Sequence, residues 1–107
     1  MSVMTEREKR VGLNLPVDVR GTSGRGAPFA ESTHSVNISG GGICFESRQK
    51  LLVGQRLTLA IDLPPALRKH FGGQPVYRAH AVVCRVERFE GDTVSRVGAR
   101  LLGEVEA

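Results

Sequence analysis

Two short groups of residues have the types and spacing that could bind a phosphate-bearing ligand. In the first, Asn37 and Ser39 stand just before three successive glycines, Gly40 to Gly42. Backbone N–H groups in a glycine turn can surround an anion, and the missing Cβ lets a ligand approach the main chain. Asn37 offers a donor and an acceptor to a base edge, and Ser39 offers a hydroxyl to a phosphate or sugar oxygen. The alternative is a turn in which both side chains satisfy only their own backbone.

The second group is basic and lies near the N-terminus. Arg7 and Arg10, with Lys9 between them, come shortly before the first expected strand. An arginine fork can bond the O6 and N7 edge of guanine, stack on a purine ring or clamp a phosphate. The net charge of +4 and the pI of about 9.7 come mostly from arginine, which favours a phosphate-bearing partner. The alternative is a solvated, charged tail without a ligand.

Patterns typical of catalysis and of metal binding are missing from the sequence. There is no G-x-S-x-G nucleophile turn, and His34, His70 and His80 are too widely spaced for an H-E-x-x-H site. Cys44 and Cys84 fit neither a metal-ligand spacing nor a C-x-x-C motif, so we expect both to be buried and reduced. The sequence predicts a protein that is not an enzyme and that holds no cofactor or metal.

Alternation of apolar and polar residues predicts the strands that position these groups. The expected strands cover residues 13–19, 32–38, 42–47, 56–63, 75–89 and 93–103. Short strands joined by hairpin-like turns, with at most a short helical turn near residues 64–71, predict an all-β, six-stranded antiparallel barrel.

The same alternation predicts which side chains of each strand face the core. In the longest strand, the residues expected to share the core face are Val76, Val82, Cys84 and Val86. Arg78 and His80 fall on that face too, so we expect the start of this strand to emerge from the core. In the first and fourth strands the expected core residues are Leu13, Leu15, Val17, Val19, Leu57, Leu59, Ile61 and Leu63.

The length of 107 residues suits one domain. We expect a flexible basic arm over residues 1–10 and a barrel over residues 11–105. The N-terminus has no apolar signal segment, and no stretch reaches the roughly 18 apolar residues of a membrane span. We therefore expect a cytoplasmic protein without membrane insertion.

Taken together, these motifs resemble the PilZ domain family. The resemblance rests on RVGLNLPVDV (residues 10–19), NISGGG (37–42) followed by ICFES, VGQRLTLAIDLP, and VGARL (97–101), and it covers nearly the whole chain. The family implies a bacterial receptor that binds cyclic di-GMP on a six-stranded antiparallel β-barrel. Its arginine arm wraps over the ligand, and its [D/N]-x-S-x-x-G turn holds the ligand from the barrel side.

Carried over to this sequence, the resemblance implies ligand-binding residues at Arg7, Arg10, Asn37, Ser39, Gly41 and Gly42. Asn37 would read a guanine edge, Ser39 would contact a phosphate or base, and Gly42 would let the turn close. Gly40 and Gly41 would provide turn conformation and close access. The arm departs from the family's R-x-x-x-R, because Glu6 stands at its first position and Arg7 lies one residue too close to Arg10.

Three functions follow as hypotheses. The leading one is a single-domain receptor whose arm becomes ordered on cyclic di-GMP and signals to a downstream protein. The alternative is a PilZ-like adaptor that binds no nucleotide and acts through protein contacts, which the irregular arm favours. A barrel that binds single-stranded nucleic acid is disfavoured, because such sites need aromatic stacking platforms. The available aromatics form no clear cluster in the sequence: Phe29, Phe45, Phe71, Tyr77 and Phe89.

Overall fold

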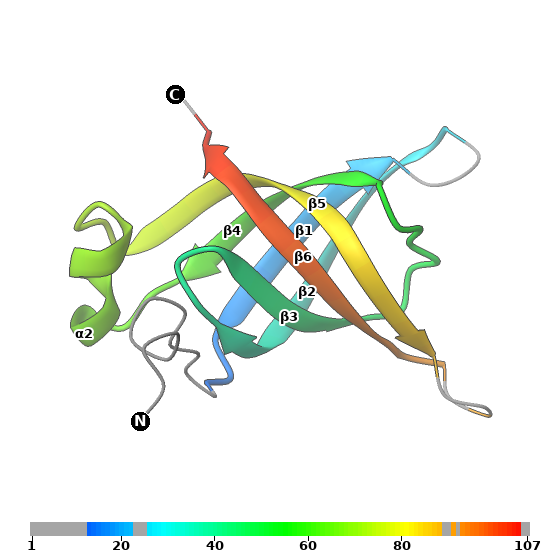
Figure 1. Cartoon of the computed structure of the whole chain (residues 1–107), viewed down its shortest axis with the longest axis horizontal. Coiled ribbons are helices and arrows are strands. Elements are labelled where there is room, and N and C mark those ends of the chain that lie inside the picture. Colours follow the sequence, from blue (N-terminus) through cyan, green and yellow to red (C-terminus); the bar gives the residue numbers. More distant parts are fainter. Residues whose placement is uncertain (1–12, 23–25, 89–90, 92, 106–107) are drawn as a thin grey trace.

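The strands form one closed antiparallel barrel. The computed structural model describes residues 13–22, 26–88, 91 and 93–105. Six strands follow the order β1-β2-β3-β6-β5-β4 around the barrel, and β4 closes it against β1 (Figure 1). Their bounds are β1 (Pro16–Thr22), β2 (Pro28–Ile38), β3 (Gly42–Ser47), β4 (Arg56–Asp62), β5 (Val76–Arg88) and β6 (Ser95–Glu104). This architecture confirms the predicted all-β barrel.

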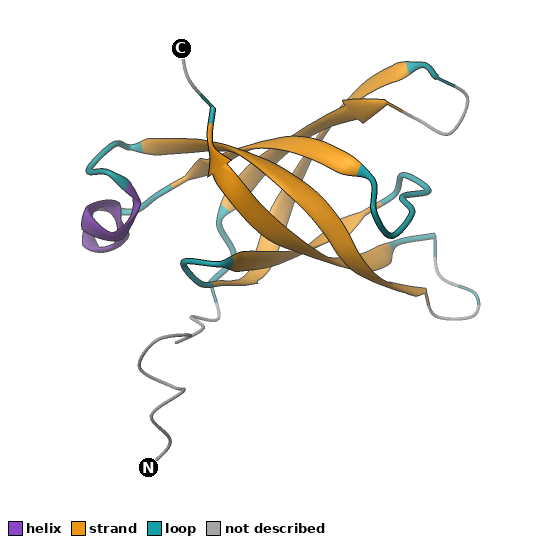
Figure 2. Ribbon diagram, turned by 45° about the horizontal axis from the view of Figure 1, so that its top comes forward, coloured by secondary structure: helices purple, strands orange, loops and turns teal. Residues whose placement is uncertain are grey.

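A short helical segment joins β4 to β5 and lies outside the strands of the barrel (Figure 2). It consists of α2 (Pro65–Arg68) and the 3-10 turn η1 (Lys69–Phe71), and it confirms the helical turn predicted near residues 64–71. Gly72, with φ of 81°, ends it in the left-handed conformation that glycine adopts without strain. Phe71 is buried, and the centroid of its ring lies 5.0 Å from the centroid of the Tyr77 ring. This aromatic pair anchors the segment to the barrel.

Alternate residues of β1 and β4 fill the barrel interior as predicted, together with residues of β3. Phe45 of β3 and Leu59 of β4 are fully buried, and the partly buried Leu13 packs against the same core. The remaining core residues of these strands and of their flanking positions are Leu15, Val17, Val19, Ile43, Leu57, Ile61 and Leu63. β2 is longer than predicted. It begins at Pro28, and its first half is a half-exposed extension that pairs with β1.

The predicted core face of β5 is wrong for the first half of that strand. Ala79, Ala81 and Val83 are buried, whereas Arg78 and His80 point outward and are exposed. Small alanines fit the interior here because a narrow barrel needs small side chains opposite large ones. The alternation pattern favoured the larger valines on the opposite face, so it did not predict that these alanines point inward.

A register shift between Val83 and Arg85 explains why the predicted core face is wrong before the shift and correct after it, at Val86. Gly98 of β6 pairs with Arg85, and Cys84 is left without a partner in the ladder. An extra residue of this kind exchanges the two faces of a strand, so Val86 packs toward the core again. Cys84 is exposed, which contradicts its predicted burial, whereas Cys44 is buried as predicted.

Within the described residues, no helix is long and apolar enough to cross a membrane. The same residues contain no group of three or more His, Cys, Asp and Glu side chains placed to hold a metal ion.

Candidate functional site

The β2–β3 turn carries the predicted Asn37 and Ser39 side chains. Asn37 is half-buried in β2 and pairs with Cys44 beyond a register shift that follows Ser35. The backbone N–H of Ser39 donates to the carbonyl of Gly42 over 2.9 Å, and the Ser39 hydroxyl donates to the same oxygen over 3.4 Å. The Gly41 carbonyl accepts from the N–H of Leu101 at 3.0 Å, which ties the turn to β6. The turn is therefore closed by its own backbone, and the long hydroxyl contact adds little.

The three glycines of the turn have different roles. A Cβ at Gly42 would lie 3.1 Å from the carbonyl oxygen of Ala99, so glycine lets β3 and β6 approach each other. Neither Gly40 nor Gly41 has a positive φ, so the turn conformation does not require glycine at these two positions. Among the described residues, no atom lies within 4 Å of a Cβ at either position. The access predicted for them fits this observation, whereas the predicted conformational role does not.

A hollow of about 220 Å³ lies beside the turn and is lined by residues of β3, β5 and β6. Its charged lining residues are Arg85 of β5 and Arg100 of β6. Arg100 is exposed and is the cross-strand partner of Gly42. The sequence patterns did not identify either arginine, because only the barrel register brings β5 and β6 beside the turn.

Gly98 of β6 also lines this hollow and adds no side chain to it. A Cβ at Gly98 would lie 3.6 Å from the Arg85 guanidinium, which extends across this glycine. The Arg85 Nε also lies 3.8 Å from a carboxylate oxygen of Glu87, in an ion pair that solvent screens. Burial raises the pKa of the neighbouring Cys44 thiol above its ordinary value, although Arg96 and Arg85 oppose this shift. Cys44 is therefore a neutral packing residue at neutral pH and not a nucleophile.

The buried Ser35 fixes the chain segment that leads into β1. Its hydroxyl accepts from the N–H of Leu15 at 2.9 Å and donates to the carbonyl of Leu13 at 2.6 Å. Its own N–H donates to the Leu15 carbonyl at 2.8 Å. Ser35 stands two residues before Asn37 on β2. Residues 13–15, which precede β1, are thus hydrogen-bonded to the strand that carries the motif. Arg7, Arg10 and the rest of the predicted arm lie outside the described residues.

A family model, the PilZ domain, matches residues 5–106, which is most of the sequence. This chain belongs to the PilZ domain family. No curated protein matches the sequence.

Solved structures share the fold of this PilZ domain at low sequence identity. MotI/DgrA, the inhibitor of motility of Bacillus subtilis, aligns with a TM-score of 0.65 and 21% identity over 90% of this chain and 41% of its own. The c-di-GMP complex of MrkH from K. pneumonia aligns with a TM-score of 0.59 and 15% identity, over 91% and 44%. The PilZ domain of YcgR from Escherichia coli, also with c-di-GMP, gives 0.56 and 14%, over 90% and 76%. The present chain thus spans less than half of the MotI and MrkH chains.

Proposed function

We propose that this PilZ domain is a bacterial, cytoplasmic receptor for cyclic di-GMP. The observation that carries the proposal is the position of the Asn37-x-Ser39-x-x-Gly42 turn at the edge of a hollow with two arginines in its lining. Cyclic di-GMP presents two phosphates and two guanines, so its site needs both positive charge and groups that read a base edge. The turn supplies groups that can read a base edge, and the hollow supplies positive charge.

Each residue of the turn has a distinct role in the proposed complex. The Asn37 amide bonds a guanine edge, for which it offers a donor and an acceptor. The Ser39 hydroxyl, whose contact to Gly42 is a long 3.4 Å, reorients to a phosphate or base. The open main chain at Gly40 and Gly41 lets the ligand come close. Arg85 and Arg100 supply positive charge from the barrel wall, and arginine forks suit phosphate oxygens.

In this proposal the arm closes the site from the opposite side. Arg10 and Arg7 bond guanine or phosphate and order residues 1–10 against the barrel. Contacts with the ligand offset the entropy of fixing the arm, which makes binding an order–disorder switch. The ordered arm then creates or hides a surface for a downstream protein. The hydrogen bonds of the Ser35 hydroxyl with Leu13 and Leu15, which we call the Ser35 clamp, support this arrangement. They hold the residues just before β1 beside the strand that bears Asn37.

Isothermal titration of the purified chain with cyclic di-GMP tests the proposal, with GMP and cyclic di-AMP as controls. Saturable heat with cyclic di-GMP alone supports it and gives the ligand stoichiometry. Absence of binding at micromolar ligand, repeated by equilibrium dialysis, overturns it.

The second candidate function is an adaptor that has lost nucleotide binding. One specific observation favours it: the arm reads R-x-x-R, and Glu6 and Glu8 bring negative charge close to a ligand with two phosphates. On an extended arm a slip of one residue moves a guanidinium by about 3.5 Å, which a long arginine side chain can absorb. An adaptor would keep its cellular activity after Arg10→Ala, whereas a receptor would lose it.

A further inference from the structure

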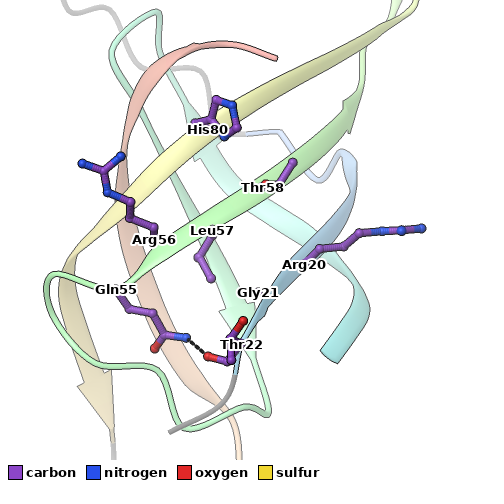
Figure 3. A pocket seen from close by; sticks show the side chains of 8 residues that line it. All are labelled: Arg20, Gly21, Thr22, Gln55, Arg56, Leu57, Thr58 and His80. Atoms are coloured by element: carbon purple, nitrogen blue, oxygen red, sulfur yellow. Dashed lines mark hydrogen bonds between the residues drawn. The ribbon is translucent and has the colours of Figure 1, made fainter. Parts of the chain in front are cut away.

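A separate basic surface lies on the outer face of β1, β4 and β5. One hollow of about 420 Å³ has Arg20, Arg56 and His80 in its lining. A second hollow, of about 330 Å³, has Arg20 and Arg78 in its lining. Both hollows also include Thr58, so they adjoin along β4. Figure 3 shows Arg20 and Arg56 extending to opposite sides of the first hollow, with Thr58 and His80 between them.

The strand register explains how this surface is built. Thr58 of β4 pairs with Arg20 of β1 on one side and with His80 of β5 on the other. Two residues further along β4, Ala60 pairs with Arg78 of β5. The outward side chains of β4 are therefore short at Thr58 and Ala60. Their neighbours are Arg20 and His80 in one cross-strand row, and Asp18 and Arg78 in the next. We call this surface, formed by Arg20, Arg56, Thr58, Ala60, Arg78 and His80, the β4 trough.

The arginines of the β4 trough are not neutralised by the rest of the described chain. Arg20, Arg56 and Arg78 are exposed and make no ion pair or side-chain hydrogen bond with another described residue. Asp18 lies at the edge of the second hollow, where its carboxylate accepts a hydrogen bond from the Ser32 hydroxyl at 3.0 Å. The trough therefore carries a net positive charge and has unused arginine donors.

We propose that the β4 trough docks an extended acidic segment of a partner protein. Arginine forks bind carboxylates bidentately. The cross-strand row that contains Arg20 passes through Thr58 of β4, and the row that contains Arg78 passes through Ala60. These rows are two residues apart along β4, a distance of about 7 Å in a strand. Alternate side chains of an extended peptide have the same spacing. A segment with Asp or Glu at alternate positions can therefore place successive carboxylates beside successive arginines.

A nucleic acid fits this surface less well than an acidic peptide. Basic surfaces that bind single strands combine their charge with aromatic rings on which bases stack. The described residues that line the two hollows include no Phe, Tyr or Trp. The trough is also distinct from the proposed nucleotide site. Along one cross-strand row, Gly42 pairs with Arg100, Arg100 with Val82, and Val82 with Arg56. Along the barrel wall, Gly42 and Arg56 are thus three strand spacings apart, or about 14 Å, and Arg100 and Arg56 are two spacings apart, or about 10 Å.

A short fluorescein-labelled peptide of alternating glutamate and serine is the probe for this proposal. Its binding is measured by fluorescence anisotropy at low salt and mapped by backbone amide NMR shifts. We expect saturable binding, with the largest shifts at Arg20, Thr58 and Arg78. The matched peptide of glutamine and serine should not bind. Shifts scattered over the whole surface, or centred on the hollow of Arg85 and Arg100, would overturn the proposal.

Two charge-reversed variants separate local docking from a general effect of net charge. Arg20→Glu combined with Arg78→Glu should weaken binding of the acidic peptide at least tenfold. Lys50→Glu combined with Lys69→Glu makes the same charge change at exposed positions elsewhere and should weaken it less than threefold. Circular dichroism verifies that both variants are folded. Equal losses in the two variants, or tighter binding of a single-stranded RNA oligonucleotide with the same dependence on Arg20 and Arg78, would contradict docking of an acidic protein segment.

The test does not depend on nucleotide binding. If the wild-type chain fails to bind cyclic di-GMP, the peptide experiment still tests the trough. If the Arg20→Glu and Arg78→Glu variant loses cyclic di-GMP binding, the trough belongs to the nucleotide site and the inference of a separate surface is wrong.

Discussion

Gly42 of the motif turn and Arg100 of β6 face each other as cross-strand partners on the outer wall of the barrel. Because Gly42 has no side chain, the position opposite Arg100 is left open. A Cβ at Gly42 would make a tight contact with the backbone of β6, since it would lie 3.1 Å from the Ala99 carbonyl oxygen. Glycine at position 42 thus lets β3 and β6 approach each other and leaves space beside the Arg100 side chain.

The first prediction concerns Arg100. Arg100→Ala should weaken cyclic di-GMP binding roughly 10- to 150-fold, because a charge-assisted hydrogen bond contributes roughly 1.5–3 kcal/mol. The barrel should remain folded, since the side chain is exposed. Titration calorimetry measures the effect, with Arg96→Ala, at another exposed position of β6, as the matched control. Similar affinities for the two variants would show that Arg100 does not contact the ligand.

The second prediction compares how much Arg10 and Arg7 contribute to the affinity for cyclic di-GMP. Arg10→Ala should reduce cyclic di-GMP affinity more than Arg7→Ala, because Arg10 keeps the family register and is closer to the clamped start of β1. Titration of both variants under the same conditions gives the comparison. Equal losses, or a larger loss at Arg7, would mean that the arm aligns differently with the family motif.

Ser39 provides a third prediction. Ser39→Ala should abolish or severely weaken cyclic di-GMP binding and leave the barrel folded. The turn is closed by the Ser39 N–H bond to Gly42, which the substitution retains, while the 3.4 Å hydroxyl contact that it removes is weak. Titration calorimetry and circular dichroism are measured on the same sample. An unfolded spectrum would instead make Ser39 a structural residue.

The glycines of the turn give a fourth prediction, in which stability and binding change separately. Gly42→Ala should lower the free energy of unfolding by about 1–3 kcal/mol, because the new methyl group meets the Ala99 carbonyl. Gly40→Ala should leave stability within about 0.5 kcal/mol, since its Cβ meets open space and its φ is not positive. It should nevertheless weaken cyclic di-GMP binding if the ligand approaches the main chain there. Urea denaturation and titration distinguish these effects, and equal stability losses would contradict the assignment.

The last prediction concerns the Ser35 clamp. Ser35→Ala should destabilise the barrel by about 1–3 kcal/mol, because it removes the hydroxyl partner of the Leu15 N–H and of the Leu13 carbonyl. Ser32→Ala is the control on the same strand, since its hydroxyl is exposed and bonds only Asp18 among the described residues. Urea denaturation compares the two variants. A loss at Ser35 no larger than at Ser32 would show that the clamp does not stabilise the start of β1.

The sequence by itself determined the strands and the motif turn. Period-2 alternation in residues such as Leu57, Leu59 and Ile61 identifies a half-buried strand, because successive side chains point to opposite faces. The Asn37-x-Ser39-x-x-Gly42 pattern is local, so its place on one hairpin follows from the order of residues alone. Six such strands with short turns leave few ways to remove the sheet edges other than closure into a barrel.

Only the tertiary structure decided which faces and which distant residues meet. The inward face of β5 depends on the register shift at Val83 and Arg85, which local alternation does not contain. The meeting of Gly42 with Arg100 depends on the pairing of β3 with β6, and the β4 trough depends on closure of β4 against β1. These contacts join residues far apart in the sequence. Their geometry is set by hydrogen-bond register and packing across the whole barrel, so it cannot be read from any single segment.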